Sequence, residues 1–271
     1  MKLSVFWDHL LQAANLHETP LPEMLRAVRR MGYDMVEMDF DTIAADPSIV
    51  SLLQGEGMEI SSIYCFFEFE KSRQADRIES LIQAALRTGA RRIMPIPGFY
   101  HGEDASYRAD EFARMLSGME RLTGLAEKAG LTVTIEDFDS AASPIRDSAG
   151  MRQFLDRLPA LRVTFDTGNF RFCGEEELSA FDALADRIAH VHLKDRALTD
   201  EYGGNCLTAL SGTPLYPCPV GSGVIPIDRI LTRLKGIGYD GVLTAEHFGC
   251  RDPLTAMQAS AEFITRTAQD R

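Results

Sequence analysis

The chain has 271 residues, of which 45% are hydrophobic and 25% are charged, and 28 Lys and Arg against 40 Asp and Glu give a formal net charge of -12. This length can bury one large core, and the acidic balance argues against nucleic-acid or anionic-membrane partners. The five cysteines are an odd number without a Cys-x-x-Cys pair, which favours free thiols over a disulfide framework. The segment MKLSVFWDHLL lacks the pattern of a signal peptide, so we expect a cytoplasmic location.

Short apolar segments alternate with longer segments of helical periodicity along the whole chain. The helical segments are amphipathic, as in 78–89, where apolar residues recur every three or four positions and Gly89 ends the pattern. Strand ends recur at intervals of about 30 residues, which is the size of one strand-helix unit. The expected strands are residues 2–7, 34–40, 58–66, 91–97, 131–136, 161–166, 188–193 and 241–247.

Eight such units predict an α/β protein with a single parallel (β/α)8 TIM barrel, in which residues 1–271 form one domain. A doubly wound open sheet is the alternative, but no Gly-x-Gly-x-x-Gly follows the first strand and such sheets rarely contain eight units. Residues 196–223 are rich in Gly and Pro, and they make the interval between the ends of the seventh and eighth expected strands longer than the other intervals. We predict an inserted loop after strand seven that acts as a lid or partner contact, with a surface excursion of no chemical role as the alternative.

Four consecutive strands end in side chains that can bind a metal ion: Glu136, Asp166, His192 and Glu246. In a barrel these strand ends meet at one mouth, and carboxylates with an imidazole suit one hard or borderline divalent ion. A single carboxylate at a strand end is more often a turn residue, but four in succession favour a metal site. We expect Mn²⁺, with Mg²⁺, Co²⁺ and Zn²⁺ left open.

Strand parity places a polar layer directly below these four residues. Side chains two apart share a face, which selects Thr134, Thr164, His190 and Thr244. Metal ligands need hydrogen-bonded partners that hold their orientation, and this layer can supply them. The simpler explanation for the threonines is their general preference for strands. Lys194 shares the face of His190 and His192, so we expect it to point toward the mouth.

The strings TIEDFDS, TFDTGNF, AHVHLKDR and GYDGVLTAEH resemble, in order, the strand ends of the sugar phosphate isomerase/epimerase superfamily with the xylose-isomerase-like barrel. This superfamily includes ketose 3-epimerases, hydroxypyruvate isomerase, inosose dehydratase and, more distantly, endonuclease IV. The resemblance implies metal ligation by Glu136, Asp166, His192 and Glu246. It also implies that Glu136 and Glu246 exchange protons with a carbon next to a carbonyl, through an enediolate that the metal stabilises.

The chain departs from the ketose 3-epimerase pattern at three positions. Asn169 replaces a substrate-contacting His, Ala142 replaces a second acidic residue, and Leu198 replaces a substrate-binding Arg. Asn169 is therefore a candidate substrate-binding residue in its own right. Lys194 and Arg196 lie near the missing Arg in the chain and are further candidates.

Four other features are weaker candidates for the site. Trp7 ends the first expected strand and can stack on a sugar or pack at the rim, and His101 lies in the loop after strand four, where substrate contact and simple solvation are both open. Glu37 and Asp39 share a face of strand two and can bind a sugar hydroxyl if that face is the lumen. The segment 221–223 can form a backbone anion site or a plain turn, which leaves phosphorylation of the substrate open.

These features predict a metal-dependent isomerase or epimerase of a small keto-sugar or related polyol. A lyase, such as a dehydratase of a keto-sugar or keto-cyclitol on the same site, is the alternative. A sugar-binding barrel without activity and an endonuclease-type hydrolase are less favoured, because all four ligands are present and the chain is acidic with six His. The expected partner is a small carbohydrate, and the oligomeric state, including a homo-oligomer, stays open.

Overall fold

Eight strands form within two residues of their predicted bounds and close into a parallel barrel. The computed structural model describes residues 1–269. Around the barrel the strands follow the order β1-β11-β7-β6-β5-β4-β3-β2, and β1 closes the ring against β11. The predicted TIM barrel is therefore confirmed. The barrel strands are β1 (Lys2–Phe6), β2 (Tyr33–Asp39), β3 (Glu59–Phe66), β4 (Arg92–Ile96), β5 (Thr132–Glu136), β6 (Arg162–Asp166), β7 (Ile188–Leu193) and β11 (Val242–Ala245).

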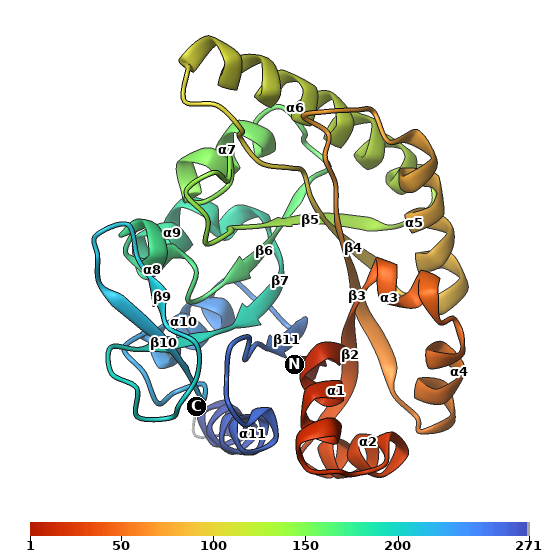
Figure 1. Ribbon diagram of the computed structural model, residues 1–271, viewed down its shortest axis with the longest axis vertical. Coiled ribbons are helices and arrows are strands. Elements are labelled where there is room, and N and C mark those ends of the chain that lie inside the picture. The colour runs from red at the N-terminus through yellow and green to blue at the C-terminus, as the bar shows by residue number, and fades with distance from the viewer. Residues whose placement is uncertain (270–271) are drawn as a thin grey trace.

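Helices connect the strands and lie outside them (Figure 1). The periodic apolar residues of 78–89 are buried on one face of α5, and Gly89 follows this helix with φ 78°. Such a left-handed residue ends a helix without the steric cost that a side chain would add. The helices are α1 (Trp7–Leu16), α2 (Leu21–Arg30), α3 (Phe40–Ala45), α4 (Ser48–Gly55), α5 (Ala75–Thr88), α6 (Ala105–Lys128), α7 (Ser148–Leu155), α8 (Phe170–Cys173), α9 (Glu177–Leu184), α10 (Ile227–Gly236) and α11 (Pro253–Gln269), with a 3-10 turn at Ala185–Arg187.

Apolar side chains fill the layer between the barrel and its helices. The long helix α6 contributes to this layer and approaches the loop after β3 closely at Gly118. A Cβ atom at Gly118 would lie 2.4 Å from the ring of Phe69, so only glycine fits this contact. The packing of α6 against this loop therefore depends on one residue.

Inside the barrel, by contrast, several strands carry polar side chains. Ser4 and Ser61 share a hydrogen bond of 2.7 Å, and Thr164 donates to Thr134 over 2.8 Å. All four side chains are buried. TIM barrels usually fill this space with branched apolar residues, so these buried hydroxyl groups depart from the usual filling.

Residues 196–223, here called the insertion, follow β7 and contain regular structure. The strands β8 (Asp195–Ala197), β10 (Pro214–Cys218) and β9 (Leu207–Thr208) form an antiparallel sheet in the order β8-β10-β9. This sheet lies to one side of the barrel near α8 and α9 in Figure 1, and the amide of Leu210 donates to the carbonyl of Phe172 in α8. The prediction of a loop at this place is confirmed, but the prediction missed its sheet because the strands are only two to five residues long and β10 contains two Pro.

The ends of the insertion are joined by one buried carboxylate. Asp195 is 1% exposed, and its carboxylate accepts from the amides of Arg196, Gly221, Gly223 and Ile225 at 2.8 to 3.2 Å. This set of contacts is here called the Asp195 clasp. It links the chain entering the insertion to the chain leaving it.

Residues 1–269 include no helix that combines the length and the apolar character needed to cross a membrane. All five cysteines lie within this range and are free. Three of them, Cys65, Cys218 and Cys250, are buried, and burial raises the pKa of each of these thiols. These three thiols are therefore protonated at neutral pH.

Candidate metal centre

Four side chains converge at the mouth formed by the carboxyl ends of the barrel strands. Glu136 and Asp166 are the last residues of β5 and β6, His192 lies in β7, and Glu246 directly follows β11. Their potential ligand atoms all lie within 4.8 Å of one another, and all four residues are buried. Glu246 stays in line with the strand ends because its amide donates to the carbonyl of Leu193 over 3.0 Å. The sequence therefore selected a set of residues that the fold brings together.

The charge of this cluster calls for a cation. Burial raises the pKa of Asp166 to about 8, and the Glu246 and Glu136 carboxylates add to this effect although Lys194 opposes it. One Asp166 oxygen accepts from the amides of Gly168 and Asn169 at 2.7 Å, while Oδ2 has no hydrogen-bond partner among the described residues. A buried carboxylate oxygen without a donor is costly unless a cation compensates it.

Lys194 supplies part of that compensation. Its ammonium forms an ion pair with Glu246, lies 3.7 Å from Asp166 Oδ2, and donates to Asn169 Oδ1 over 2.7 Å. Burial opposes the charge of Lys194, but the Asp166 and Glu246 carboxylates raise its pKa above the usual value. A cation therefore already contacts two of the four residues. The donor set of three carboxylates and one imidazole fits a divalent ion.

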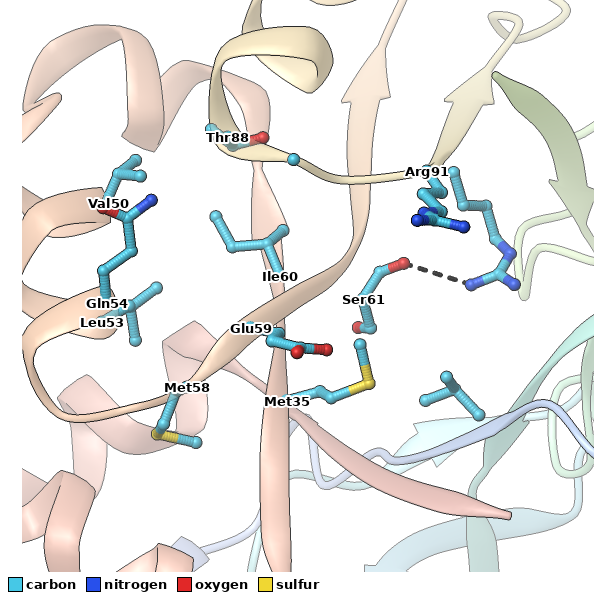
Figure 2. A pocket seen from close by; sticks show the side chains of 13 residues that line it. Met35, Val50, Leu53, Gln54, Met58, Glu59, Ile60, Ser61, Thr88 and Arg91 are labelled. Atoms are coloured by element: carbon cyan, nitrogen blue, oxygen red, sulfur yellow. Dashed lines mark hydrogen bonds between the residues drawn. The ribbon is translucent and has the colours of Figure 1, made fainter. Parts of the chain in front are cut away.

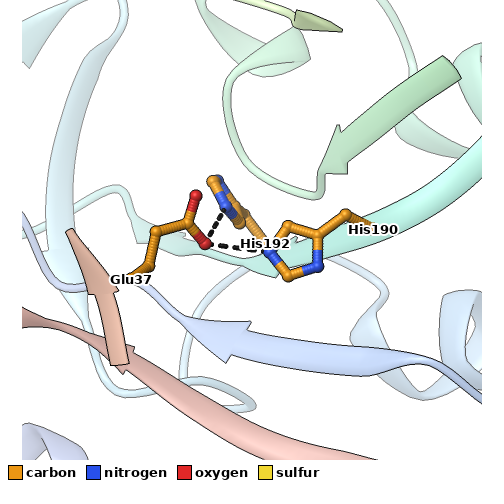
Figure 3. Close-up of side chains that lie close together, drawn as sticks. All are labelled: Glu37, His190 and His192. Atoms are coloured by element: carbon orange, nitrogen blue, oxygen red, sulfur yellow. Dashed lines mark hydrogen bonds and ion pairs between the residues drawn. The ribbon is translucent and has the colours of Figure 1, made fainter. Parts of the chain in front are cut away.

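Below this cluster, His192 contacts a second carboxylate, that of Glu37 (Figure 3). Its Nδ1 faces Glu136 and Glu246, and its Nε2 donates to Glu37 over 3.0 Å. Burial opposes protonation, but the Glu136 and Glu37 carboxylates hold the pKa of His192 well above its usual value. His190 donates to the same Glu37 oxygen over 2.8 Å.

The predicted lower layer consists of buried side chains that all point into the barrel. Thr134 and Thr164 bond to each other, whereas His190 and Thr244 bond to Glu37, at 2.8 and 3.2 Å. Sequence reasoning placed Glu37 with the sugar-binding candidates. The structure instead buries Glu37 completely beneath the metal residues, where it contacts imidazoles.

A cavity of about 470 Å³ opens above the cluster and has two different walls. One wall is aromatic and the other is polar. The aromatic wall was not predicted, because its members come from β1, β3 and the segments that follow β5 and β11, and they carry no motif. Parity gave one signal: Phe6 lies two residues after the lumen-facing Ser4. The aromatic wall consists of Phe6, Tyr64, Phe66, Phe138 and Phe248, and the polar lining includes Glu136, Asp139, Asn169, Lys194, Arg196, Asn205 and Glu246.

Three of the predicted substrate-binding residues line this cavity: Asn169, Lys194 and Arg196. Asn169 is oriented by two bonds, since its Nδ2 donates to the Asp137 carbonyl over 2.8 Å and its Oδ1 accepts from Lys194. Arg196 donates to Asp139 Oδ2 over 2.8 Å. Both cations of the lining are thus paired with carboxylates. The insertion adds Asn205, Cys206 and Leu207 to the lining.

Other predicted positions lie elsewhere. Trp7 begins α1, is 2% exposed and packs in the core, because β1 ends at Phe6 and Phe6 takes the lumen position. His101 bonds to Glu70 over 2.9 Å outside the cavity lining. Asp39 accepts from the amide of Asp41 at the start of α3, so it is a helix cap. The expectations of substrate contact by Trp7, His101 and Asp39 find no support in this geometry.

The predicted anion site at 221–223 is filled by the chain itself. The amides of Gly221 and Gly223 each donate to Asp195 Oδ2 over 2.9 Å. A Cβ atom at Gly223 would lie 2.3 Å from the Asp195 carboxylate, so the backbone approaches it as closely as glycine allows. The backbone amides of this segment do bind an anion, but the anion is the carboxylate of Asp195 and not a ligand.

A second cavity, of about 380 Å³, lies at the opposite end of the barrel, where β3 and β4 begin (Figure 2). Its lining mixes apolar side chains, such as Met35 of β2 and Leu53 of α4, with polar ones, among them Arg91 and Arg92. Arg92 donates to the carbonyls of Ser61 and Ala189 there, at 3.1 Å each, and so ties β4 to β3 and to β7. This end of a TIM barrel serves stability rather than chemistry.

Residues 25–267 match the model of the xylose isomerase-like TIM barrel family. The inosose dehydratase of Lacticaseibacillus casei is 29% identical over 143 residues, which cover 51% of this chain and 47% of that protein. The match thus spans about half the length of this curated relative.

Three solved structures are similar to almost the whole chain. D-psicose 3-epimerase of Clostridium cellulolyticum H10, determined with D-tagatose, has a TM-score of 0.72 and 15% identity, and the match covers 98% of both chains. The IolI protein with a bound zinc atom has a TM-score of 0.71 and 17% identity, with 100% and 99% coverage. A xylose isomerase-like protein of Mycobacterium smegmatis in complex with magnesium has a TM-score of 0.69 and 19% identity, with 92% and 88% coverage.

Proposed function

Because the chain belongs to the xylose isomerase-like TIM barrel family, we propose that it is a divalent-metal-dependent isomerase or epimerase of a small keto-sugar or related polyol. The observation that carries the proposal is the convergence of Glu136, Asp166, His192 and Glu246, with ligand atoms within 4.8 Å of one another, below a cavity that Glu136 and Glu246 also line. The substrate is a small carbohydrate that enters this cavity. We propose Mn²⁺ as the ion, because three carboxylates and one imidazole suit it.

The four residues would hold the ion, and the two glutamates would also move protons. When bound, the ion supplies Lewis-acid polarisation of a carbonyl group, which acidifies the neighbouring C–H bond. One glutamate removes this proton, and the other returns a proton to the opposite face of the same carbon, which inverts it. Return of the proton to the adjacent carbon isomerises the sugar instead.

Other residues of the lining would orient the substrate. Asn169 and Lys194 present an amide and an ammonium next to Glu246, where they can bind hydroxyl or carbonyl oxygens. Arg196 is held by Asp139 at the same wall. The insertion, whose residues 205–207 line the cavity, would act as a lid over the substrate and exclude water, which would strengthen each of these polar contacts.

We also propose that the substrate carries no phosphoryl group. Barrels often bind phosphate with backbone amides after strands seven and eight, and here the amides of Gly221, Gly223 and Ile225, which follow strand seven, bind the Asp195 carboxylate. Both cations of the cavity are paired with carboxylates. A dianion entering the cavity would therefore find no unpaired cation in the lining.

A dehydratase on the same site is the second candidate function, and Lys194 favours it. In that reaction a glutamate removes the proton next to the carbonyl, a C=C bond forms, and the C–O bond of the next carbon breaks. The Lys194 ammonium, held beside Glu246 in the cavity wall, can protonate the departing hydroxyl so that water leaves. The match to an inosose dehydratase supports this candidate as well.

Solvent isotope exchange separates the two reactions. Mn²⁺-loaded protein is incubated in D₂O with a panel of ketoses and keto-cyclitols and followed by NMR. Deuterium in an epimerised or isomerised sugar supports the first function, and loss of water with an unsaturated product supports the second. Glu136→Gln should lower either rate about 10²- to 10⁴-fold. Absence of exchange with every compound would contradict both functions.

A further inference from the structure

Glu37 reaches across the barrel interior and contacts residues of two other strands. It lies in β2, whereas His190 and His192 lie in β7 and Thr244 in β11. Its Oε2 accepts from His190 Nε2 over 2.8 Å, from His192 Nε2 over 3.0 Å and from Thr244 Oγ1 over 3.2 Å. The side chain is completely buried. A buried carboxylate with three donors on one oxygen is held in a single orientation.

The contact to His192 determines which nitrogen of that imidazole is available to a metal ion. A carboxylate accepts only from a nitrogen that carries a proton, so Nε2 of His192 is the N–H nitrogen. Nδ1 bonds to Glu136 and faces Glu246, so it is the nitrogen that would give up its proton and bind an ion at the cluster. Hydrogen bonding at one imidazole nitrogen is a general way to fix the tautomer and raise the basicity of the other.

We propose that Glu37 is a positioning residue that holds His192 with Nδ1 turned toward Glu136 and Glu246, and thereby sets the affinity of the site for a divalent ion. The proposal rests on the proposed function, because it requires the metal site. His190 and Thr244 serve it indirectly, since their bonds to Oε2 fix the carboxylate. Glu37 does not line the cavity, so it acts through His192 rather than on the substrate.

The same three residues can also be considered as ligands of a second ion, because the ligand atoms of Glu37, His190 and His192 lie within 4.8 Å of one another (Figure 3). Two facts favour positioning. The nitrogen-to-oxygen distances of 2.8 and 3.0 Å are those of hydrogen bonds, and His192 would have to give both ring nitrogens to metal ions. The metal content of the protein distinguishes the two arrangements.

The test uses Co²⁺ as the probe, with affinity measured by calorimetry and coordination by the visible spectrum. We expect one Co²⁺ per wild-type chain. Glu37→Gln keeps the shape and an oxygen acceptor but removes the negative charge that makes the His192 ring more basic, so we expect about a 10-fold weaker affinity. Glu37→Ala removes the acceptor as well and should weaken the affinity about 10- to 100-fold and shift the visible bands. Asp39→Asn changes a carboxylate of the same strand that caps α3, and it should leave affinity and spectrum unchanged.

Each other result counts against the proposal. Glu37 variants that fold, as judged by circular dichroism and cooperative unfolding, and that keep the wild-type affinity and spectrum would overturn it. Two Co²⁺ per wild-type chain and one in Glu37→Ala would show a second metal site instead. A wild-type chain that binds no Co²⁺ would overturn the metal-dependent function itself. If Glu37→Ala does not fold, Thr244→Val removes one of the three bonds, and an unchanged affinity in both Thr244→Val and Glu37→Gln refutes the proposal.

Discussion

Replacing Asp195 with Ala removes a buried side chain that joins both ends of the insertion. Its carboxylate accepts from the amides of Arg196 over 2.8 Å, of Gly221 and Gly223 over 2.9 Å each, and of Ile225 over 3.2 Å. The bonds to Arg196 and Ile225 are buried, whereas those to the two glycines are partly exposed. In the variant, water can reach the glycine amides but not the other two.

The expected loss follows from these two buried donors. A buried amide without an acceptor costs about 1–3 kcal/mol, so two of them cost about 2–6 kcal/mol. Burial raises the pKa of Asp195 against the effect of the four amides, which means that ionising this carboxylate in the wild-type protein has its own cost. We therefore expect Asp195→Ala to lower the free energy of unfolding by about 2–4 kcal/mol, in the lower part of that range.

Urea unfolding measures the loss, and limited proteolysis shows where the chain has loosened. We expect cleavage of Asp195→Ala first within 196–223. Asp200→Ala removes an exposed carboxylate of the same insertion and serves as the control. If Asp195→Ala unfolded at the wild-type urea concentration and resisted protease equally, the clasp would not hold the insertion, and the argument against a phosphate site would lose its basis.

Three further predictions concern stability. Mn²⁺ at about 100 times its Kd should raise the free energy of unfolding of the wild-type protein by about 2.7 kcal/mol, measured by thermal unfolding. Asp166→Asn should abolish this gain, and an equal gain in the variant would contradict the assignment of Asp166 as a metal ligand. Burial, reinforced by His247, lowers the pKa of His9 from 6.5 to about 3, so the unfolded chain takes up the proton first and the free energy of unfolding falls as the pH drops below 6.5. We expect a loss of about 2 kcal/mol between pH 7 and 5. Urea unfolding at the two pH values should show a smaller loss in His9→Gln, and an equal loss would contradict the role of His9. Gly118→Ala should lower the free energy of unfolding by about 1–3 kcal/mol because its Cβ meets the Phe69 ring, and an unchanged melting temperature would show that the helix can shift without cost.

The barrel and the four metal residues could be predicted because each depends on local patterns. Apolar runs separated by amphipathic helices define the strands. The carboxyl ends of all strands of a parallel barrel lie at the same mouth, so the last residue of a strand lies there whichever strands pair with it. Glu136 and Asp166 are the last residues of their strands in the structure, as they are in the prediction. Parity then identified Thr134 and Thr164 as lumen residues without any knowledge of the sheet order.

The partners of Glu37 and Asp195 could not be predicted, because they depend on which strands and loops face each other across the barrel. Glu37 meets His192 from a strand more than a hundred residues away, with a separation of 155 positions. Trp7 shows an error of a local kind. The prediction ended the first strand at Trp7, whereas the strand ends at Phe6, and because successive residues of a strand face opposite sides, this shift selected a core side chain in place of the lumen side chain. An error of one residue is within the usual uncertainty of an element boundary.

The hydrogen-bonded barrel interior also affects how the chain finds its strand alignment. In a barrel interior made only of branched apolar residues, one apolar side chain can pack against many different apolar neighbours, so the interior does not require specific pairs. Here Ser4 of β1 must meet Ser61 of β3 across the intervening β2, and Thr134 of β5 must meet Thr164 of the neighbouring β6. A sheet that closed with a strand shifted by two residues would bury these hydroxyls without partners. The interior that supports the metal residues therefore also discriminates against misaligned barrels during folding.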